Sequence, residues 1–515
     1  MKKRNLTLAI ALLLAGCSVT PDYEVEQTIG MDQIYLNQAD TVTSSEENTD
    51  HWWKGFNDPQ LNQLIEQVQQ QNLTISIAAQ RIQAAKAYEQ AVSSFNIPTI
   101  SLGAGGFSYG ISEKDPLLGG IVSGIDNPLN GQTIDLVDRD QYGFMVGANI
   151  SWEMDIFGKL DALSQAASIR LEQAEIMQQG MVTLITTDLI HNYIQYRGAQ
   201  ERLNIAKQNI DEQHQTLDMV KSLVNSGYGS DLDLAKAKAA LAGVRASQTV
   251  FETAEKVHLY RIATLLGQHP SSLEGKFEDA PLPTVTGKIP VGLPSDLLKR
   301  RTDIAFAERE MAAVNQELGA SIAAKYPSFY ITASPATLAK NADDLFSSGS
   351  SSWLGVAGVT WNVFDGGRSD AMVELQESRF KQAGLRYQQT VNDAFNEVET
   401  TLMTYGNSMM FHEQLAEAAE QSQMAVTKAK SLYQAGLIDY LQVLDAQRQD
   451  NQVKDAMVLA KLNVANNLLL VNKSLGGDWQ VENQPNGANV DNANAENAGA
   501  ENADVNSAAA SKVAE

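Results

Sequence analysis

The chain has 515 residues, with 38 Lys and Arg against 62 Asp and Glu, which gives a formal net charge of -24 at pH 7. That charge excludes a nucleic-acid-binding protein, because a phosphate backbone requires a surface rich in basic side chains. No apolar run reaches the roughly 20 residues that a membrane-spanning helix needs. The single cysteine, Cys17, excludes internal disulfides and thiolate metal clusters.

The N-terminus has the organisation of an export signal. Residues 2–4 are basic, and a short apolar stretch follows over residues 6–14. Leu14-Ala15-Gly16-Cys17 then resembles a bacterial lipobox, in which the chain is cut before the cysteine and the thiol is acylated. An ordinary signal peptide with an incidental cysteine is the alternative.

The lipobox interpretation divides the first 55 residues in two. Residues 1–16 are predicted to be a lipoprotein signal peptide, and residues 17–55 an extended segment that carries lipid on Cys17. Ser18, in place of Asp, indicates sorting to the outer membrane of a Gram-negative bacterium.

Four segments with a period of two predict β-strands. The longest covers residues 142–154, residues 353–363 repeat its pattern, and shorter alternations follow Pro98 and Pro327. A half-buried sheet of a soluble protein gives the same pattern, but the length and the terminal aromatic residues favour membrane strands. Four such strands cannot close a barrel without copies from other chains. The side chains expected to face lipid are Phe144, Val146, Ile150, Trp152, Val359, Trp361 and Val363.

The remaining segments predict helices of unusual length. Residues 159–225 and 368–434 contain no proline, and at about 1.5 Å per residue each predicts a helix of about 100 Å. Turns at Gly227 and Gly436 end them. Shorter helices are expected over residues 231–266, 440–475 and 295–325, and a further one begins at Asp58-Pro59, an N-cap carboxylate followed by proline.

The chain contains an internal duplication. An offset of 209 residues pairs Trp152 with Trp361, Gly158 with Gly367, Lys221-Ser222-Leu223 with Lys430-Ser431-Leu432, Gly227 with Gly436, and Leu266-Gly267 with Leu475-Gly476. The duplication predicts two equivalent units, residues 56–266 and 295–480, joined by an equatorial linker, residues 267–294. Residues 481–515 are rich in Asn, Ala and acidic side chains and are expected to be a disordered tail.

Three motifs resemble those of a known protein family. Residues 51–61 read His-Trp-Trp-Lys-Gly-Phe-Asn-Asp-Pro-Gln-Leu, similar to the opening of the lipoprotein efflux subunits. Residues 361–368, Trp-Asn-Val-Phe-Asp-Gly-Gly-Arg, resemble the strand-to-helix junction of the family. Residues 429–436 with 440–447 resemble its second helix turn. Together the motifs resemble the outer-membrane efflux ducts of the TolC/OprM type, and the likeness covers residues 17–480.

The resemblance implies an α+β membrane protein that is a homotrimer. Four strands per chain would form one 12-stranded β-barrel in outer-membrane lipid, continued by a periplasmic tube of coiled-coil α-helices. The implied function is a passive exit duct for small toxic compounds or drugs, as in multidrug resistance. The implied partners are a periplasmic adaptor (membrane fusion protein) and an inner-membrane pump of the RND type. The alternatives are the outer-membrane duct of a type I protein secretion system and an envelope lipoprotein without a pore.

The same resemblance assigns functions at the helix turns. Gly227, Tyr228, Ser230, Gly436 and Leu437 would contact the adaptor. In the family, a pair of aspartates three residues apart lines the closed aperture. Asp445 matches the second of them, and Gln442 replaces the first, so one threefold ring of carboxylates is expected.

Two further residues belong to the expected aperture. Tyr433 and Asp233 match members of a lock whose arginine is replaced here by Ile438. Capping is the alternative for the polar side chains, because Ser230 with Asp233, and Asp439 with Gln442, have the i, i+3 spacing of a capping box.

Nothing in the sequence indicates catalysis. The six histidines lack a metal-binding spacing, and no phosphate-binding loop or nucleophile elbow is present. We therefore expect no enzyme activity, no cofactor and no metal site.

Overall fold

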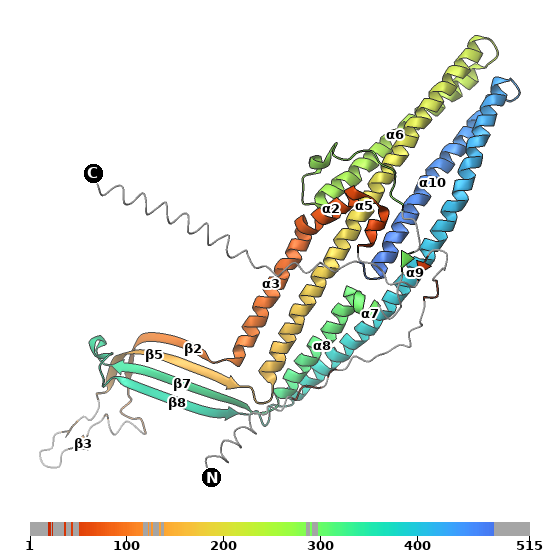
Figure 1. The fold of residues 1–515 in the computed structure, drawn as a ribbon. Coiled ribbons are helices and arrows are strands. Elements are labelled where there is room, and N and C mark those ends of the chain that lie inside the picture. Colours follow the sequence, from red (N-terminus) through yellow and green to blue (C-terminus); the bar gives the residue numbers. More distant parts are fainter. Residues whose placement is uncertain are drawn as a thin grey trace, which may run out of the picture. The chain divides into compact units, whose positions relative to one another are not determined.

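The computed structural model describes residues 19–21, 23, 35–37, 43–44, 51–116, 122, 125–126, 133–134, 138–284, 289–290 and 297–477. The signal peptide, Cys17, the tail from 481 and linker residues 285–288 and 291–296 lie outside them. The chain forms two compact units, and Figure 1 labels their helices and strands. Unit 1 is Met1–Met31, Leu73–Gln178 and Thr302–Asn396, and unit 2 is Asp32–Asn72, Gln179–Arg301 and Glu397–Glu515. Each unit therefore contains segments of both sequence repeats.

The long helices begin in unit 1 and end in unit 2. They are α5 (Lys159–Asn225) and α9 (Arg368–Gln434), each of 67 residues, with the bounds that the sequence predicts. Among the described residues, none of the helices combines the length and the apolar character needed to cross a bilayer.

Unit 1 contains a four-stranded antiparallel sheet with the strand order β2-β5-β7-β8. Its strands are β2 (Thr99–Gly110), β5 (Asp140–Met154), β7 (Ser328–Ala339) and β8 (Ser351–Thr360). The other elements of the unit are α3 (Leu73–Ser93), η2 (Ser94–Asn96), α8 (Thr302–Ala323), η5 (Ala342–Asp344) and the short pair β3 (Ile125–Asp126) and β4 (Thr133–Ile134).

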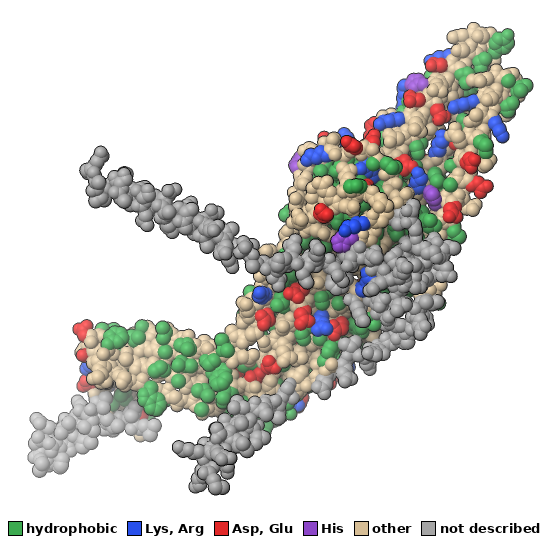
Figure 2. Space-filling view, viewed as in Figure 1, with side chains coloured by type: hydrophobic (Ala, Val, Ile, Leu, Met, Phe, Trp, Pro, Cys, Tyr) green, Lys and Arg blue, Asp and Glu red, His purple; other side chains and the backbone are tan. Residues whose placement is uncertain are grey.

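The register of the sheet separates two faces. Ile100 and Ile150 lie opposite one another, as do Ile331 and Trp152, so their side chains share one face. That face is apolar and open, with Leu102 85% and Trp353 82% exposed. Figure 2 shows hydrophobic side chains gathered over the strands. The residues of this apolar face are Ile100, Leu102, Ala104, Phe144, Val146, Ile150, Trp152, Phe329, Ile331, Trp353 and Val359.

The opposite face is more mixed than the sequence predicts. Asn149 and Ser151 lie on it, but so do Leu354 and Val356 of β8. Aromatic rings cover glycines of the neighbouring strands: a Cβ on Gly143 would lie 2.8 Å from the Phe107 ring. The small side chains of this face therefore make room for rings as well as for solvent.

Strand β8 is shorter than predicted. It ends at Thr360, so Trp361 and Val363 lie beyond the sheet. The register would place Pro327 opposite Trp361, and proline has no N–H to continue the ladder. Instead, the Trp361 indole donates a hydrogen bond to the Lys325 carbonyl, at 3.0 Å.

Polar contacts join the helices of unit 1 side by side. Ser93 of α3 contacts Ser164 of α5 at 2.6 Å. Arg170 of α5 pairs with Glu317 of α8 at 2.7 Å. Met311 of α8 would lie 3.5 Å from a Cβ on Gly384 of α9, which places these two helices in contact.

Unit 2 contains the two helix hairpins, one from each repeat. These pair the ends of α5 and α9 with α6 (Asp231–Leu265) and α10 (Tyr440–Ser474). Its remaining elements are β1 (Thr43–Ser44), η1 (Trp52–Phe56), α2 (Pro59–Gln71), η3 (Pro270–Leu273), β6 (Ile289–Pro290) and α7 (Leu297–Arg300).

The start of α2 is as predicted, whereas the segment before it is not extended. The Asp58 carboxylate accepts hydrogen bonds from the Gln60 and Leu61 amides, with Pro59 in the first helical position. The Trp-Trp segment is the 3-10 helix η1, because Trp53 and Phe56 turn inward and are buried.

The duplication extends to backbone geometry. Gly158 and Gly367 both have positive φ, and so do Gly227 and Gly436. The Trp152 indole donates to the Asn96 carbonyl at 3.1 Å, which corresponds to the bond from Trp361 to Lys325.

Both N-terminal helical segments are interrupted, which the sequence does not predict. The first breaks at Asn72, between α2 and α3, and the second at Arg301, between α7 and α8. The second also ends at Ala323, two residues before its predicted end.

A side-chain hydrogen bond fixes each break within unit 2. Asn72 Nδ2 donates to the carbonyl of Leu265, the last residue of α6, at 2.7 Å. Arg301 Nη1 donates to the carbonyl of Ser474, the last residue of α10, at 2.8 Å. Leu265 and Ser474 correspond in the repeat, so each return helix is capped from the equivalent break.

These caps lead to a prediction. Asn72→Leu keeps the size of a buried side chain but leaves the Leu265 carbonyl without its donor, and we expect it to lower the free energy of unfolding by about 1–3 kcal/mol. Denaturant unfolding of the purified protein measures this. Gln71→Leu, at the exposed neighbouring position, is the control and should change stability by less than about 0.5 kcal/mol. Equal effects would show that the cap is not important.

Candidate functional site

The helix turns of unit 2 are built the same way in both repeats. Gly227 N donates to Val224 O at 3.0 Å and Tyr228 N to Leu223 O at 2.9 Å. The corresponding amides of Gly436 and Leu437 donate to Tyr433 and Leu432, both at 2.9 Å. This is the Schellman motif, which requires positive φ at the glycine and therefore excludes most other residues there.

The residue after each glycine is apolar and exposed. Tyr228 is 87% and Leu437 70% exposed, and Leu232 and Leu441 in the following helices are open as well. Figure 2 shows hydrophobic side chains at the ends of both hairpins. An exposed apolar patch of this kind indicates an interaction surface.

The two turns differ in their caps. Ser230 Oγ accepts from the Asp233 amide at 3.2 Å and donates to Asp233 Oδ2 at 2.8 Å, so Ser230 and Asp233 are engaged in capping. The side chain of Asp439 makes no cap hydrogen bond. The capping interpretation therefore holds at the first turn and is wrong for Asp439, where only the backbone carbonyl accepts from Gln442 N, at 3.1 Å.

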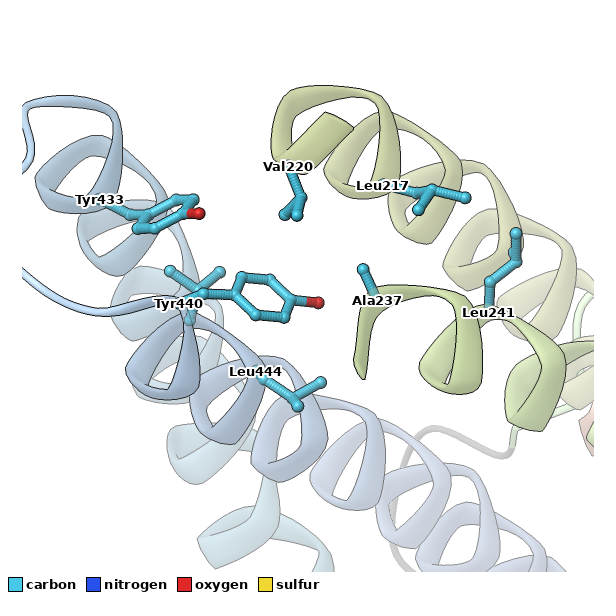
Figure 3. Packing of buried hydrophobic residues seen from close by; sticks show 8 residues of the cluster. Leu217, Val220, Ala237, Leu241, Tyr433, Tyr440 and Leu444 are labelled. Atoms are coloured by element: carbon cyan, nitrogen blue, oxygen red, sulfur yellow. The ribbon is translucent and has the colours of Figure 1, made fainter. Parts of the chain in front are cut away.

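A hydrophobic cluster joins the two hairpins next to the turns (Figure 3). Tyr433 and Tyr440 face one another with ring centroids 5.8 Å apart and planes at 52°. They pack with side chains from α5, α6 and α10, namely Leu217, Val220, Ala237, Leu241, Val443 and Leu444. Tyr433 thus lies in the contact between the hairpins, and its role in an aperture stays a prediction.

Burial perturbs both tyrosines. Burial, and then the Asp233 carboxylate, raises the pKa of Tyr433. Burial, with smaller contributions from Tyr433 and Asp233, raises the pKa of Tyr440 to about 12, although Arg448 opposes the shift. The cluster is therefore neutral at physiological pH.

The predicted aperture residues of α10 lie on its open side. Gln442 and Asp445, one helical turn apart, are both exposed, whereas Val443 and Leu444 between them are buried in the cluster. This side is free to line a lumen, while the opposite side holds the hairpins together. Among the described residues, no group of three or more His, Cys, Asp or Glu side chains is placed to hold a metal ion.

Sequence reasoning missed Tyr440. It is 1% exposed, and its hydroxyl has no hydrogen-bond partner among the described residues. A hydrophobic staple indicates the cluster but not Tyr440 itself: Ile438 precedes the N-cap Asp439, Val443 lies four positions into the helix, and both pack in the cluster.

A family model described as "Outer membrane efflux protein" matches residues 64–268 and 293–477. The two matched ranges correspond closely to the two sequence repeats.

Curated relatives match almost end to end. The "Solvent efflux pump outer membrane protein SrpC" of Pseudomonas putida is 27% identical over 493 residues, 93% of this chain and 99% of the relative. The "Cation efflux system protein CusC" of Escherichia coli O6:H1 is 28% identical, over 92% and 98%.

A solved structure titled "Structural insights of the outer-membrane channel OprN" superposes with a TM-score of 0.81. It is 28% identical and covers 90% of this chain and 100% of that chain. The predicted fold class, strands joined to long paired helices with an internal duplication, is confirmed.

The orphan hydroxyl of Tyr440 leads to a prediction. Tyr440→Phe removes a buried polar group without a partner and should leave the free energy of unfolding unchanged or raise it by up to about 1 kcal/mol. Tyr440→Ala removes the ring and should cost about 3–5 kcal/mol. Thermal unfolding of both variants measures this. A loss above about 1 kcal/mol for the phenylalanine variant would mean that the hydroxyl has a partner in the assembled protein.

Proposed function

Because the chain belongs to the outer membrane efflux protein family, we propose that it is the passive exit duct of a tripartite efflux system. It would carry small toxic compounds from an inner-membrane pump of the RND type across the periplasm and outer membrane. The names of the relatives, solvent efflux for SrpC and cation efflux for CusC, support the efflux branch over protein secretion.

The observation that carries this proposal is the sheet of unit 1. Strands β2 and β8 form its two edges, and neither has a second neighbour among the described residues. Edge strands of 12 and 10 residues would leave rows of N–H and C=O groups unpaired. In lipid these groups must be satisfied, so the edges pair with those of other copies. Three chains with four strands each give the 12-stranded barrel.

The faces of the sheet fit such a barrel. Apart from Asp140 at the first position of β5, the apolar face carries no charged side chain, as a lipid-facing surface requires. Trp152 and Trp361 lie near its end, where aromatic side chains favour the membrane interface. Asn149 and Ser151 would face the lumen.

The N-terminal residues of unit 1 fit a lipid anchor at Cys17. Thr20 packs directly on Gly319 of α8, and Asn315 Nδ2 donates to the Pro21 carbonyl at 2.9 Å. These contacts place Thr20 and Pro21, which follow the proposed lipid anchor in the sequence, on the part of α8 that leads into β7.

The turns would contact the periplasmic adaptor through Tyr228 and Leu437. Asp445 would form a threefold carboxylate ring at the aperture, with Gln442 beside it. Conductance in planar bilayers tests the duct: a pore-free envelope lipoprotein gives none. Copurification with an ABC exporter instead of an RND pump would favour type I secretion.

The barrel leads to a prediction about its faces. Val146→Arg places a charge on the proposed lipid face and should cost about 2–4 kcal/mol if it lies near the midplane. Asn149→Arg, the control on the opposite face, should be mild. Unfolding in lipid-containing micelles measures both, and equal costs would show that the faces are assigned wrongly.

The aperture leads to a second prediction. Asp445→Ala should reduce cation preference and block by multivalent cations, because it removes the ring of charge. Gln442→Asp adds a second ring and should change both in the opposite direction. Bilayer reversal potentials measure the effect, with Asp231→Ala, another exposed carboxylate near a turn, as the control. Unchanged selectivity in both variants would mean that this side of α10 faces away from the pore.

A further inference from the structure

Unit 2 contains a cavity of about 140 Å³ between α9 and α10. Tyr405, Met409 and His412 line it from α9, at positions one and two turns apart on one side of the helix. Val464, Ala465 and Leu468 line it from α10, and Phe56 lies against it. The lining is therefore mostly apolar.

Two polar groups of the lining have no partner among the described residues. Tyr405 is 4% exposed, and no hydrogen bond of its hydroxyl is present. His412 Nε2 is also unpaired, but it has almost no accessible surface, so a molecule in the cavity does not reach it. Burial raises the pKa of Tyr405. By contrast, the Lys461 ammonium at the cavity is neutralised by Glu201, at 2.7 Å.

The other repeat contains the same site in a filled form. Tyr196 corresponds to Tyr405, and its hydroxyl accepts a hydrogen bond from Gln200 Nε2 at 2.9 Å. Gln200 also donates to Glu255 at 3.1 Å. In the second repeat Met409 stands in place of Gln200, and Val464 in place of Glu255.

This comparison shows what the second repeat has lost. The polar side chains that fill the first site are replaced by apolar ones, while the tyrosine is kept. Unsatisfied buried polar groups cost stability unless a ligand or water pairs with them.

We propose that this cavity binds a neutral single-ring molecule that carries one hydroxyl group, of the phenol class. The volume suits one ring, since a cavity of roughly 150 Å³ with apolar walls holds benzene. The hydroxyl pairs with the Tyr405 hydroxyl. A carboxylate is disfavoured, because the charge of Lys461 is already compensated by Glu201.

Titration calorimetry of the purified full-length protein with phenol tests the proposal. The expected result is saturable binding of one phenol per chain. Tyr405→Phe removes the partner hydroxyl but keeps the ring, and it should weaken phenol binding about tenfold, the equivalent of one hydrogen bond, but leave toluene binding unchanged.

The second test, a repeat swap, replaces residues of this site by those at the corresponding positions of the first repeat. Met409→Gln with Val464→Glu rebuilds the filled site and should abolish phenol binding. Met424→Gln, the same change on an exposed part of α9, is the control and should not affect it. Absence of saturable binding, for instance because a neighbouring chain fills the cavity, overturns the inference. Phenol binding that survives the swap, or that is unchanged by Tyr405→Phe, overturns it equally.

The inference goes beyond the duct function and fails separately from it. A protein that conducts ions in bilayers but does not bind phenol contradicts only the ligand site. A protein that binds phenol but shows no conductance contradicts only the duct.

Discussion

The backbone hydrogen bonds at the edges of the sheet are the constraint on which the rest depends. A four-stranded sheet with an apolar, open face is stable in neither solvent alone: water disfavours the face, and lipid disfavours the unpaired edges. Both conditions are met when the edges β2 and β8 pair between copies of the chain and the face turns to lipid. Oligomerisation is then a requirement of the secondary structure. The association of the strands also brings the long helices of the copies together, because α5 and α9 each follow a strand of the sheet after a short connection.

The duplication repeats the chemistry of specific contacts as well as the order of elements. Asn72 and Arg301 differ in size and charge, yet each donates to the last carbonyl of the return helix in its own repeat. Such a donor satisfies one of the orphan carbonyls that every helix end leaves. Because two different residue types perform the same task, the contact itself, rather than sequence similarity, is what the two halves have in common.

The sequence predicts elements well where local chemistry decides and poorly where tertiary contacts do. Both long helices and the Asp58 cap could be predicted, because absence of proline, glycine turns and a capping residue act locally. The breaks at Asn72 and Arg301 could not, since neither involves Pro or Gly and each depends on the end of a distant helix. The end of β8 follows from a proline on the neighbouring strand, which requires the register. At the turns, Ser230 and Asp439 have the same spacing to their partners, but only Ser230 caps.

The difference between the caps at Ser230 and Asp439 makes the two hairpins unequal in stability at their turns. A side-chain cap typically contributes about 0.5–2 kcal/mol to the first turn of a helix. The start of α6 has this contribution from Ser230, and the start of α10 lacks a side-chain hydrogen bond from Asp439. At α10 the buried ring of Tyr440 takes over the fixing role, but its hydroxyl is left without a partner among the described residues. Close to the exposed Asp445 and Gln442, packing and one hydrogen bond hold the second hairpin to the first: Gln447 Nε2 donates to Thr216 Oγ1 of α5 at 3.1 Å. Because the first turn of α10 lacks the side-chain cap that stabilises the first turn of α6, it can shift at the lower cost in free energy.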